Sequence, residues 1–313
     1  MMLKNRTSGV LRIGNRAFTQ VTLICAFIIV AILVNILVVL TLQAWPAIRE
    51  FGAPFLSSST WDPVKNEYGA LPAIYGTLIS SLLALVIAVP LSIGAAIFLV
   101  ELSPAWIRGP ASFIIEMLAA IPSVIIGLWG LFVLVPFVRS PIESWLGTHL
   151  GSLSFFQGPP FGFGFLAAAI ILAIMIIPII TAMSRDVLRA VPSTQREAML
   201  ALGATRWETI SRAVLPYGRS GLVGAVLLGL SRALGETMAV TMVIGNGNKI
   251  TASLFSPGTT IPSKIANEFG EASGIGLSSL IELALILFVI TLLVNVIARL
   301  LVWRLTAGKM ARE

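Results

Sequence analysis

Residues 197–208 read Glu-Ala-Met-Leu-Ala-Leu-Gly-Ala-Thr-Arg-Trp-Glu, and Val-Leu-Pro follows at 214–216. This stretch is polar, whereas the segments on both sides of it are apolar. An acidic helix start, a face of small residues, a glycine break and a second short amphipathic turn predict a knob with two arms. Such a knob is suited to contacting another protein. The alternative is an ordinary amphipathic surface helix between two apolar segments.

The composition of the chain indicates a membrane protein. Hydrophobic residues make up 57% of the chain and charged residues only 11%, and the mean hydropathy is +0.96. A run of about 20 apolar residues crosses a hydrocarbon layer of about 30 Å. Runs of this kind cover residues 21–42, 72–100, 111–138, 163–184, 221–245 and 277–303. We therefore expect an all-α membrane protein with six transmembrane helices, kinked at Pro90 and Pro122.

Basic residues are distributed unequally between the loops. One set precedes the first run, lies between the fourth and fifth runs, or follows the sixth: Lys4, Arg6, Arg12, Arg16, Arg185, Arg189, Arg196, Arg206, Arg212, Arg219, Arg304, Lys309 and Arg312. The opposite loops carry only Arg49, Lys65, Arg139, Lys249 and Lys264. The positive-inside rule then predicts that both termini and residues 185–219 are cytoplasmic. The net charge of +7 is explained by topology, so we expect no nucleic-acid binding.

The sequence offers little catalytic chemistry. Gly308-Lys309-Met310 lacks the remaining residues of a phosphate-binding P-loop, so the chain is not expected to hydrolyse ATP. Cys25 is the only cysteine and His149 the only histidine. These counts argue against a disulfide framework, a Cys/His metal site and a histidine-based catalytic triad within one chain. We expect no enzyme activity of the chain alone and no cofactor.

Ionisable residues within the apolar runs are candidates for function, because charge is costly in lipid and normally faces a cavity or a partner. They are Glu116, Arg232, Glu236, Glu282 and Arg299. Arg232 and Glu236 are four residues apart, so on a helix they share a face and can pair.

The residues around this pair favour an anion site. Ser231, Gly235, Thr237 and Thr241 leave space and offer hydrogen bonds. A planar guanidinium matches the oxygens of a tetrahedral oxyanion, and a nearby carboxylate limits how tightly the anion is held. We predict a substrate path formed by Arg232, Glu236, Ser231 and Thr237. The alternative is an ion pair that only fixes the fifth helix to its neighbours.

Several motifs together resemble the phosphate-specific Pst permeases of ABC importers, C-type (PstC) subunit, over residues 45–303. They are Trp61-Asp62-Pro63, Tyr75-Gly76-Thr77-Leu78, Ala88-Val89-Pro90-Leu91, Ile121-Pro122-Ser123 and Arg232-Ala233-Leu234-Gly235-Glu236-Thr237-Met238-Ala239. The pattern E-A-x-x-A-L-G-A-T at 197–205 resembles the EAA loop, which docks on an ATPase subunit. The resemblance implies this coupling role for Glu197, Ala198, Ala201, Gly203, Ala204 and Thr205.

The resemblance also implies an architecture and an assembly. The fold would be that of a type I ABC importer (MetI-like) permease. Its parts would be a cytoplasmic basic N-terminus (1–20), a peripheral transmembrane helix (21–42), a periplasmic interfacial segment (43–71), a permease core (72–303) with the coupling loop 185–219, and a cytoplasmic tail (304–313). The partners would be a paralogous PstA-type permease subunit, two ATP-binding PstB-type subunits, a periplasmic phosphate-binding protein and membrane lipid.

The expected function is therefore ATP-driven import of inorganic phosphate across a bacterial inner (plasma) membrane by alternating access. Two alternatives remain open from the residues. A permease for another oxyanion or small solute would share the fold and the loop. A secondary transporter would commonly show two similar halves, whereas the EAA pattern occurs once.

Overall fold

The computed structural model describes residues 4–310, and side chains for residues 18–300 and 303. Within that range the chain is helical, and its β structure is limited to isolated bridges. The α-helices are α1 (Lys4–Phe51), α2 (Pro54–Ser57), α3 (Leu71–Ile97), α4 (Ala105–Ala119), α5 (Ser123–Trp129), α6 (Val135–Phe137), α7 (Ser144–Leu150), α8 (Phe165–Arg189), α9 (Ser193–Ala201), α10 (Arg206–Thr209), α11 (Leu215–Leu234), α12 (Met238–Val243), α13 (Ile261–Glu268) and α14 (Gly274–Met310). Wider π-helical turns are η1 (Phe98–Leu102), η2 (Gly130–Leu134), η3 (Val138–Glu143) and η5 (Ile210–Val214), and η4 (Ser154–Phe156) is a 3₁₀ turn. The expected all-α fold is confirmed.

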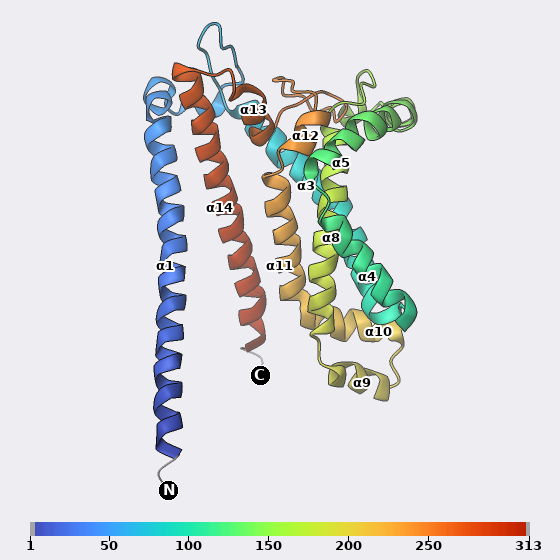
Figure 1. Cartoon of the computed structure of the whole chain (residues 1–313). Coiled ribbons are helices and arrows are strands. Elements are labelled where there is room, and N and C mark those ends of the chain that lie inside the picture. The colour runs from blue at the N-terminus through green and yellow to red at the C-terminus, as the bar shows by residue number, and fades with distance from the viewer. Residues whose placement is uncertain (1–3, 311–313) are drawn as a thin grey trace.

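Among the described residues, 6 helical segments are long and apolar enough to cross a membrane, which confirms the predicted number. The start of α1 and the end of α14 lie at the same end of the molecule as α9 and α10, and α13 lies at the opposite end (Figure 1). We refer to these as the α9 end and the α13 end.

The third crossing differs from the prediction of one kinked helix over residues 111–138, because the helical segment long and apolar enough to cross runs from Ser123 to Leu150. The first helix, α4, stops at Ala119, and α5 begins at Ser123. Between them Pro122 has an extended backbone, with φ −58° and ψ 136°. Proline lacks the N–H of a helical hydrogen bond and disfavours a helical conformation in the residue before it, so the helix ends here. At Pro90, by contrast, α3 continues without interruption.

The fifth crossing also differs from the predicted run 221–245. The helical segment that contains it starts earlier, at Arg206, because α10, η5 and α11 follow one another without a break. It also ends earlier: α11 stops at Leu234, and the short helix α12 begins only at Met238. Gly235 follows the last residue of α11. Glycine is the weakest helix former except proline, so it favours the end of the helix at this point. The Arg232–Glu236 segment therefore lies at a helix break and not within a continuous helix.

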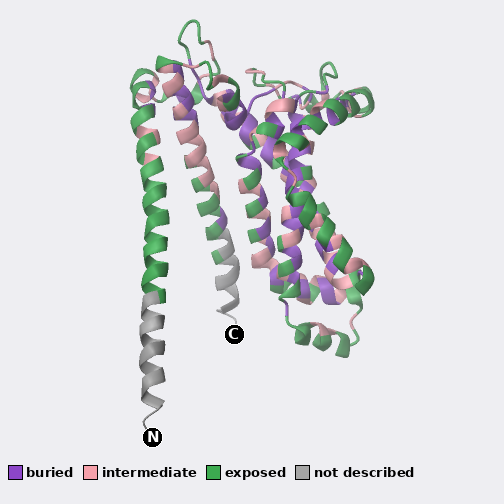
Figure 2. Cartoon of the chain, in the orientation of Figure 1, coloured by how far each residue is buried: buried purple, intermediate pink, exposed green. Residues whose placement is uncertain are grey.

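The core is built around α8, which packs against α3, α4, α11 and α12. Its most apolar window is 67% buried, whereas the corresponding window of α1 is 0% buried. Small and branched side chains of α8 occupy the interior, among them Ala168, Ile171, Leu172 and Ile176. Figure 2 shows the contrast: buried residues line the centre of the molecule, and α1 is exposed over most of its described side chains, with Ala44 and Ala47 buried near its end. α1 is thus a peripheral helix beside α14.

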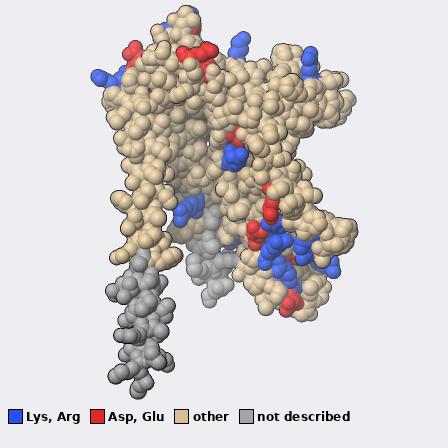
Figure 3. All heavy atoms as spheres, viewed as in Figure 1, with Lys and Arg blue, Asp and Glu red and all other residues tan. Residues whose placement is uncertain are grey.

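Charged side chains gather at the two ends of the molecule. In Figure 3 the surface between the ends is mostly uncharged, with a few blue and red side chains at mid-height, and a mixed but predominantly basic cluster covers the α9 end. This distribution is what a membrane-spanning protein requires, because charged groups are costly in the hydrocarbon layer.

Candidate functional site: an open ion pair at a helix break and a two-helix knob

Arg232 and Glu236 form a loose ion pair across the α11–α12 break. Arg232 Nη2 lies 3.6 Å from Glu236 Oε2, and the two side chains are 48% and 6% exposed. The backbone N–H of Ala239, in the first turn of α12, approaches Glu236 Oε1 at 3.5 Å. The carboxylate is therefore held in the interior at the start of α12, while the guanidinium faces outward.

The hydroxyl groups beside this pair have different surroundings. Ser231 Oγ lies 3.0 Å from Asn295 Oδ1 of α14, which ties α11 to the last helix. Thr237 Oγ1 donates only a long bond, 3.3 Å, to the carbonyl of Gly235. The threonine hydroxyl can therefore turn toward a ligand at the break, whereas the serine hydroxyl is used between helices.

The structure does not gather the other intramembrane charges at this site. Glu116 of α4 pairs with Arg185 of α8, Nη1 to Oε1 at 2.9 Å, and Arg185 also bonds Asp186. Glu282 and Arg299 lie on α14 and make no ion pair with Arg232. Of the charged candidates, only Arg232 and Glu236 come together.

The polar stretch that begins at residue 197 forms two short helices, α9 and α10. Gly203 separates them with φ +81°, a conformation that glycine adopts at little cost. Thr205 caps α10 by accepting the N–H of Glu208, whose Oε2 in turn accepts the N–H of Thr205. The predicted shape of a knob with two arms is confirmed. The expected acidic helix start is wrong, because α9 begins at Ser193 and Glu197 lies in its interior, with no acidic residue in the first turn.

The residues implied for coupling lie on the open side of this knob. Glu197, Ala198, Ala201, Gly203 and Thr205 are exposed, and Ala204 is half-buried. Two large apolar side chains accompany them, because Leu202 is 84% and Trp207 65% exposed. An exposed apolar cluster rimmed by polar residues is typical of a protein contact.

The base of the knob is fixed by an ion pair that sequence reasoning missed. Arg196 Nη2 lies 2.7 Å from Glu101 Oε1 in η1, and its Nε also bonds this carboxylate. The same guanidinium donates to the carbonyls of Leu188 (2.9 Å) and Val191 (2.6 Å). A signal existed in the sequence, since Glu101 is the one acidic residue between positions 68 and 115, directly after the second apolar run. The sequence alone assigns Arg196 only to the basic residues that predict a cytoplasmic loop.

The α13 end carries a second polar cluster. Lys264 Nζ bonds Glu268 Oε1 at 2.7 Å and lies 4.6 Å from the centre of the Trp61 ring, while Trp61 Nε1 donates to Glu268 Oε2 at 2.6 Å. Burial lowers the pKa of Lys264, and the Glu268 carboxylate only partly opposes this effect. The cluster fastens the segment after α1 to α13.

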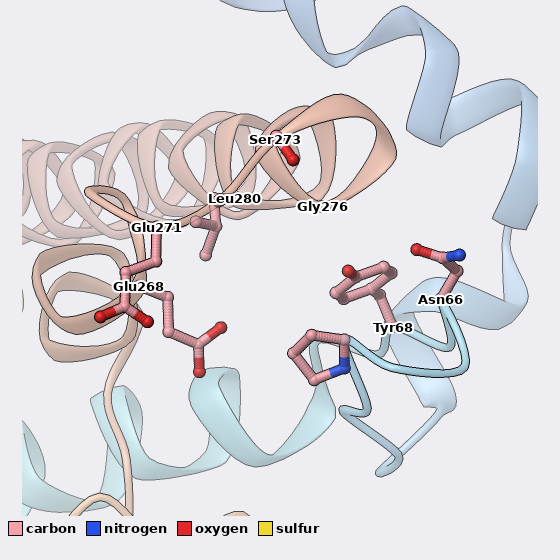
Figure 4. Close-up of a pocket in the computed structure, with 9 residues that line it drawn as sticks. Asn66, Tyr68, Glu268, Glu271, Ser273, Gly276 and Leu280 are labelled. Atoms are coloured by element: carbon pink, nitrogen blue, oxygen red, sulfur yellow. The ribbon is translucent and has the colours of Figure 1, made fainter.

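A cavity of about 440 Å³ lies beside this cluster. Figure 4 shows the carboxylate of Glu268 and the ring of Tyr68 bordering it, with Glu271 close by and Ser273 on the α14 side. Two carboxylates repel an anion, so an oxyanion path is better placed at the α11–α12 break.

Comparison with known proteins identifies the family. The model of binding-protein-dependent transport system inner membrane components matches residues 88–307. The chain is 50% identical over 298 residues to the "Phosphate transport system permease protein PstC" of Haemophilus influenzae, covering 93% of this chain and 95% of that protein. The chain belongs to the PstC family of binding-protein-dependent permeases. A PstC protein of Pasteurella multocida is also 50% identical, over 292 residues that cover 92% of this chain and 91% of that one.

Solved structures show the fold of this PstC-family chain. The MetNI methionine ABC transporter in an inward-facing conformation matches with a TM-score of 0.56 at 18% identity, over 74% of this chain and 94% of that one. A bacterial alginate ABC transporter matches with 0.54 at 18% identity, over 81% and 87%. The expected MetI-like permease fold is confirmed.

Membership in the PstC family makes the chain a multi-pass inner-membrane transport component of an ABC importer, a class that works with an ATP-binding subunit and a periplasmic binding protein. It also removes the secondary transporter from the alternatives.

Proposed function

We propose that this chain is the C-type permease subunit of an ATP-driven importer that takes inorganic phosphate from a periplasmic binding protein and moves it into the cytoplasm. In this proposal it pairs with a PstA-type permease and rests on two PstB-type ATP-binding subunits. The names of the curated relatives support the solute, and the chemistry at the α11–α12 break supports an oxyanion.

The observation that carries the proposal is the open side of Arg232. Its guanidinium has one carboxylate contact, at 3.6 Å, and remains 48% exposed. Most of its N–H donors are therefore free to bind two oxygens of one phosphate in the fork geometry that arginine favours. Glu236 stays buried behind it and offsets part of the charge, which keeps the anion from being held too long.

Thr237 extends this site from the other side of the break. Its hydroxyl is bound only weakly to Gly235, so it can donate to a phosphate oxygen. Because α11 and α12 are separate helices at this point, a rearrangement of the subunits can change which side of the membrane the break faces without breaking a regular helix. Alternating access then follows from the subunit movement.

The knob formed by α9 and α10 is proposed to be the contact for the ATP-binding subunit. Its tip presents Leu202 and Trp207, and its base is bound through Arg196 to η1 and to the end of α8. A movement of the ATP-binding subunit would then reach η1 through the ion pair with Glu101 and the central helix α8 through the hydrogen bond from Arg196 to the Leu188 carbonyl.

In the same proposal the α9 end is cytoplasmic. The test uses single cysteines in a Cys25→Ser background, labelled in intact cells by a reagent that does not cross the membrane. Val64→Cys, at a side chain that is 92% exposed near α13, should label, and Arg206→Cys should not. Lys264 is unsuitable as an outside probe because its side chain is 6% exposed. Labelling at position 206 would reverse the orientation.

The solute is tested in proteoliposomes that contain the assembled transporter, with ATP inside and the binding protein outside. Phosphate uptake should depend on ATP and should be unaffected by excess sulfate. If sulfate competes equally well, the chain serves a broader oxyanion permease. If uptake follows an ion gradient without ATP, the proposal is wrong.

A further inference from the structure

Glu282 is a buried carboxylate that the transport path does not use. It lies on α14, eight residues after the first residue of that helix, and its side chain is 6% exposed. Its Oε2 is buried without a hydrogen-bond partner among the residues that the structure describes. An unpaired carboxylate within a membrane span is costly, and such residues normally meet a ligand or a partner.

Glu282 lines a groove between the peripheral helix and the last helix. The cavity measures about 580 Å³. Apart from this carboxylate its walls carry only apolar side chains and glycine: Ile48, Gly52, Ala53, Leu56, Ile74, Leu285, Ile286, Val289 and Ile290. The groove therefore combines one acidic group with an extended apolar surface.

The carboxylate and the apolar wall of the groove occupy different positions along α14. Gly52 and Ala53 form the turn between α1 and α2, at the α13 end of the membrane span, and Ile74 is the fourth residue of α3. Glu282 lines the same cavity, eight residues or about 12 Å along α14 from its first residue. From Glu282 to Ile290 the apolar wall continues along α14 for eight more residues, again about 12 Å of helix. Among the groove residues of α14, the carboxylate is thus nearest the α13 end, and the apolar wall runs from it toward the α9 end.

We propose that this groove binds an aminophospholipid, with its ammonium group on Glu282 and an acyl chain along Val289 and Ile290. The carboxylate oxygen lacks a donor, and a primary ammonium supplies three. A choline headgroup has positive charge but no N–H, and an anionic lipid would place like charge beside the carboxylate. The order of the groups in the lipid, a cation at one end and an alkyl chain beyond it, matches the order from Glu282 to Ile290 along the groove.

Native mass spectrometry of the assembled complex tests this proposal. The complex, in micelles, is titrated with phosphatidylethanolamine, phosphatidylcholine or phosphatidylglycerol that carry the same acyl chains. The wild-type complex should retain phosphatidylethanolamine about tenfold better than phosphatidylcholine, as expected for hydrogen bonds to a charged group. Glu282→Gln, which removes the charge, should bring the two lipids to similar retention.

A second variant keeps the carboxylate and fills the groove. Val289→Trp should reduce retention of phosphatidylethanolamine about as strongly as Glu282→Gln, so it tests the site even if the latter variant assembles poorly. Leu292→Trp is the matched control, because Leu292 is a similarly exposed residue of α14 outside the groove. It should retain the lipid as the wild type does.

Three results would overturn the proposal. The first is equal retention of phosphatidylethanolamine and phosphatidylcholine by the wild type, and the second is unchanged lipid selectivity in both groove variants. The third is a Val289→Cys variant, in the Cys25→Ser background, that crosslinks efficiently to the second permease subunit, because that subunit would then fill the groove. Phosphate uptake is measured separately, so a failure here leaves the proposed function untouched.

Discussion

The α9 end and the α11–α12 break each contain an arginine–glutamate pair, and the two pairs differ in what they leave free. Arg196 bonds Glu101 through Nε and Nη2 and also donates to two backbone carbonyls. Arg232 has a single contact of 3.6 Å with Glu236. The side chain of Arg196 is 21% exposed and that of Arg232 is 48% exposed.

The difference separates a structural from a functional use of the same two residue types. The donors of Arg196 are occupied by protein acceptors, so this pair can fix α9 to η1 and α8 but has little capacity for a ligand. Most donors of Arg232 are unoccupied, so this pair adds little to stability and can bind an anion.

The largest expected effect is that of Arg232→Gln on transport. Glutamine keeps a donor but removes the charge and leaves Glu236 to repel phosphate. Because hydrogen bonds to charged groups contribute about 1.5–3 kcal/mol, phosphate uptake should fall by about 10- to 100-fold, while the amount of assembled complex stays at the wild-type level. Arg232→Lys should give an intermediate rate, since a point charge replaces a planar fork.

Uptake is measured in proteoliposomes and normalised to assembled complex. An uptake rate within twofold of wild type for Arg232→Gln would reduce this pair to a structural bridge, and the comparison would fail.

The second prediction concerns the stability of the closed pair. Arg196→Gln should destabilise the complex by about 2 kcal/mol, less than the 3–5 kcal/mol of a fully buried pair because both partners are partly exposed. Glu101→Gln should cost less, since Arg196 keeps its two carbonyl acceptors. Thermal unfolding in detergent, with the double variant added, gives the coupling energy of the pair.

The same cycle on Arg232 and Glu236 is the control. The open pair should show a coupling energy near zero in stability, below about 0.5 kcal/mol. Equal coupling energies for both pairs would mean that exposure and hydrogen bonding do not distinguish them.

The contrast also shows what the sequence could predict. The apolar runs predicted six crossings, and the spacing of Arg232 and Glu236 predicted that they meet, because both features depend on local composition. The partner of Arg196 could not be predicted with the same rule, since Glu101 lies 95 residues away in the chain. Only the packing of η1 against α8 and α9 brings them together.

Local breaks were harder to predict than spans. Pro122 and Gly235 were visible in the sequence, but membrane helices tolerate both residue types when neighbours satisfy the backbone. Whether a helix kinks or ends depends on those neighbours, such as the Glu236 carboxylate that accepts the Ala239 N–H at the start of α12. The groove at Glu282 depends likewise on where α1 packs.

A smaller effect is expected from Glu236→Gln. Glutamine retains an oxygen that can accept the Ala239 N–H, so the start of α12 should remain intact. Removal of the negative charge leaves Arg232 unbalanced, and phosphate should be held longer. An exposed ion pair contributes up to about 1 kcal/mol, so we expect uptake to slow by up to about fivefold while retention of phosphate by the transporter rises.

Rapid-mixing release of labelled phosphate measures this change. A faster release in Glu236→Gln would contradict the role of Glu236, because it would show that the carboxylate helps to hold the anion. Glu268→Gln, at the α13 end and away from the break, is the control and should leave release unchanged.

The smallest effect belongs to the tip of the knob, at Gly203. Among the described residues, no atom lies within 4 Å of a Cβ built at this position, so a larger side chain meets no steric obstacle within the chain. The remaining cost is the backbone conformation at φ +81°, about 1–2 kcal/mol for alanine and less for asparagine or aspartate.

If the backbone conformation at Gly203 decides the effect, coupling of ATP hydrolysis to uptake should be lowered most by Gly203→Ala. If contact with the ATP-binding subunit decides the effect, Gly203→Asp should lower coupling more than Gly203→Ala, because it adds bulk and charge to the docking face.

Gly224→Ala is the matched control, since its Cβ also meets open space but the glycine lies within α11 without a positive φ. That substitution should leave coupling unchanged. Equal, wild-type coupling in both Gly203→Ala and Gly203→Asp would exclude the tip from the contact and confine coupling to the anchored base at Arg196.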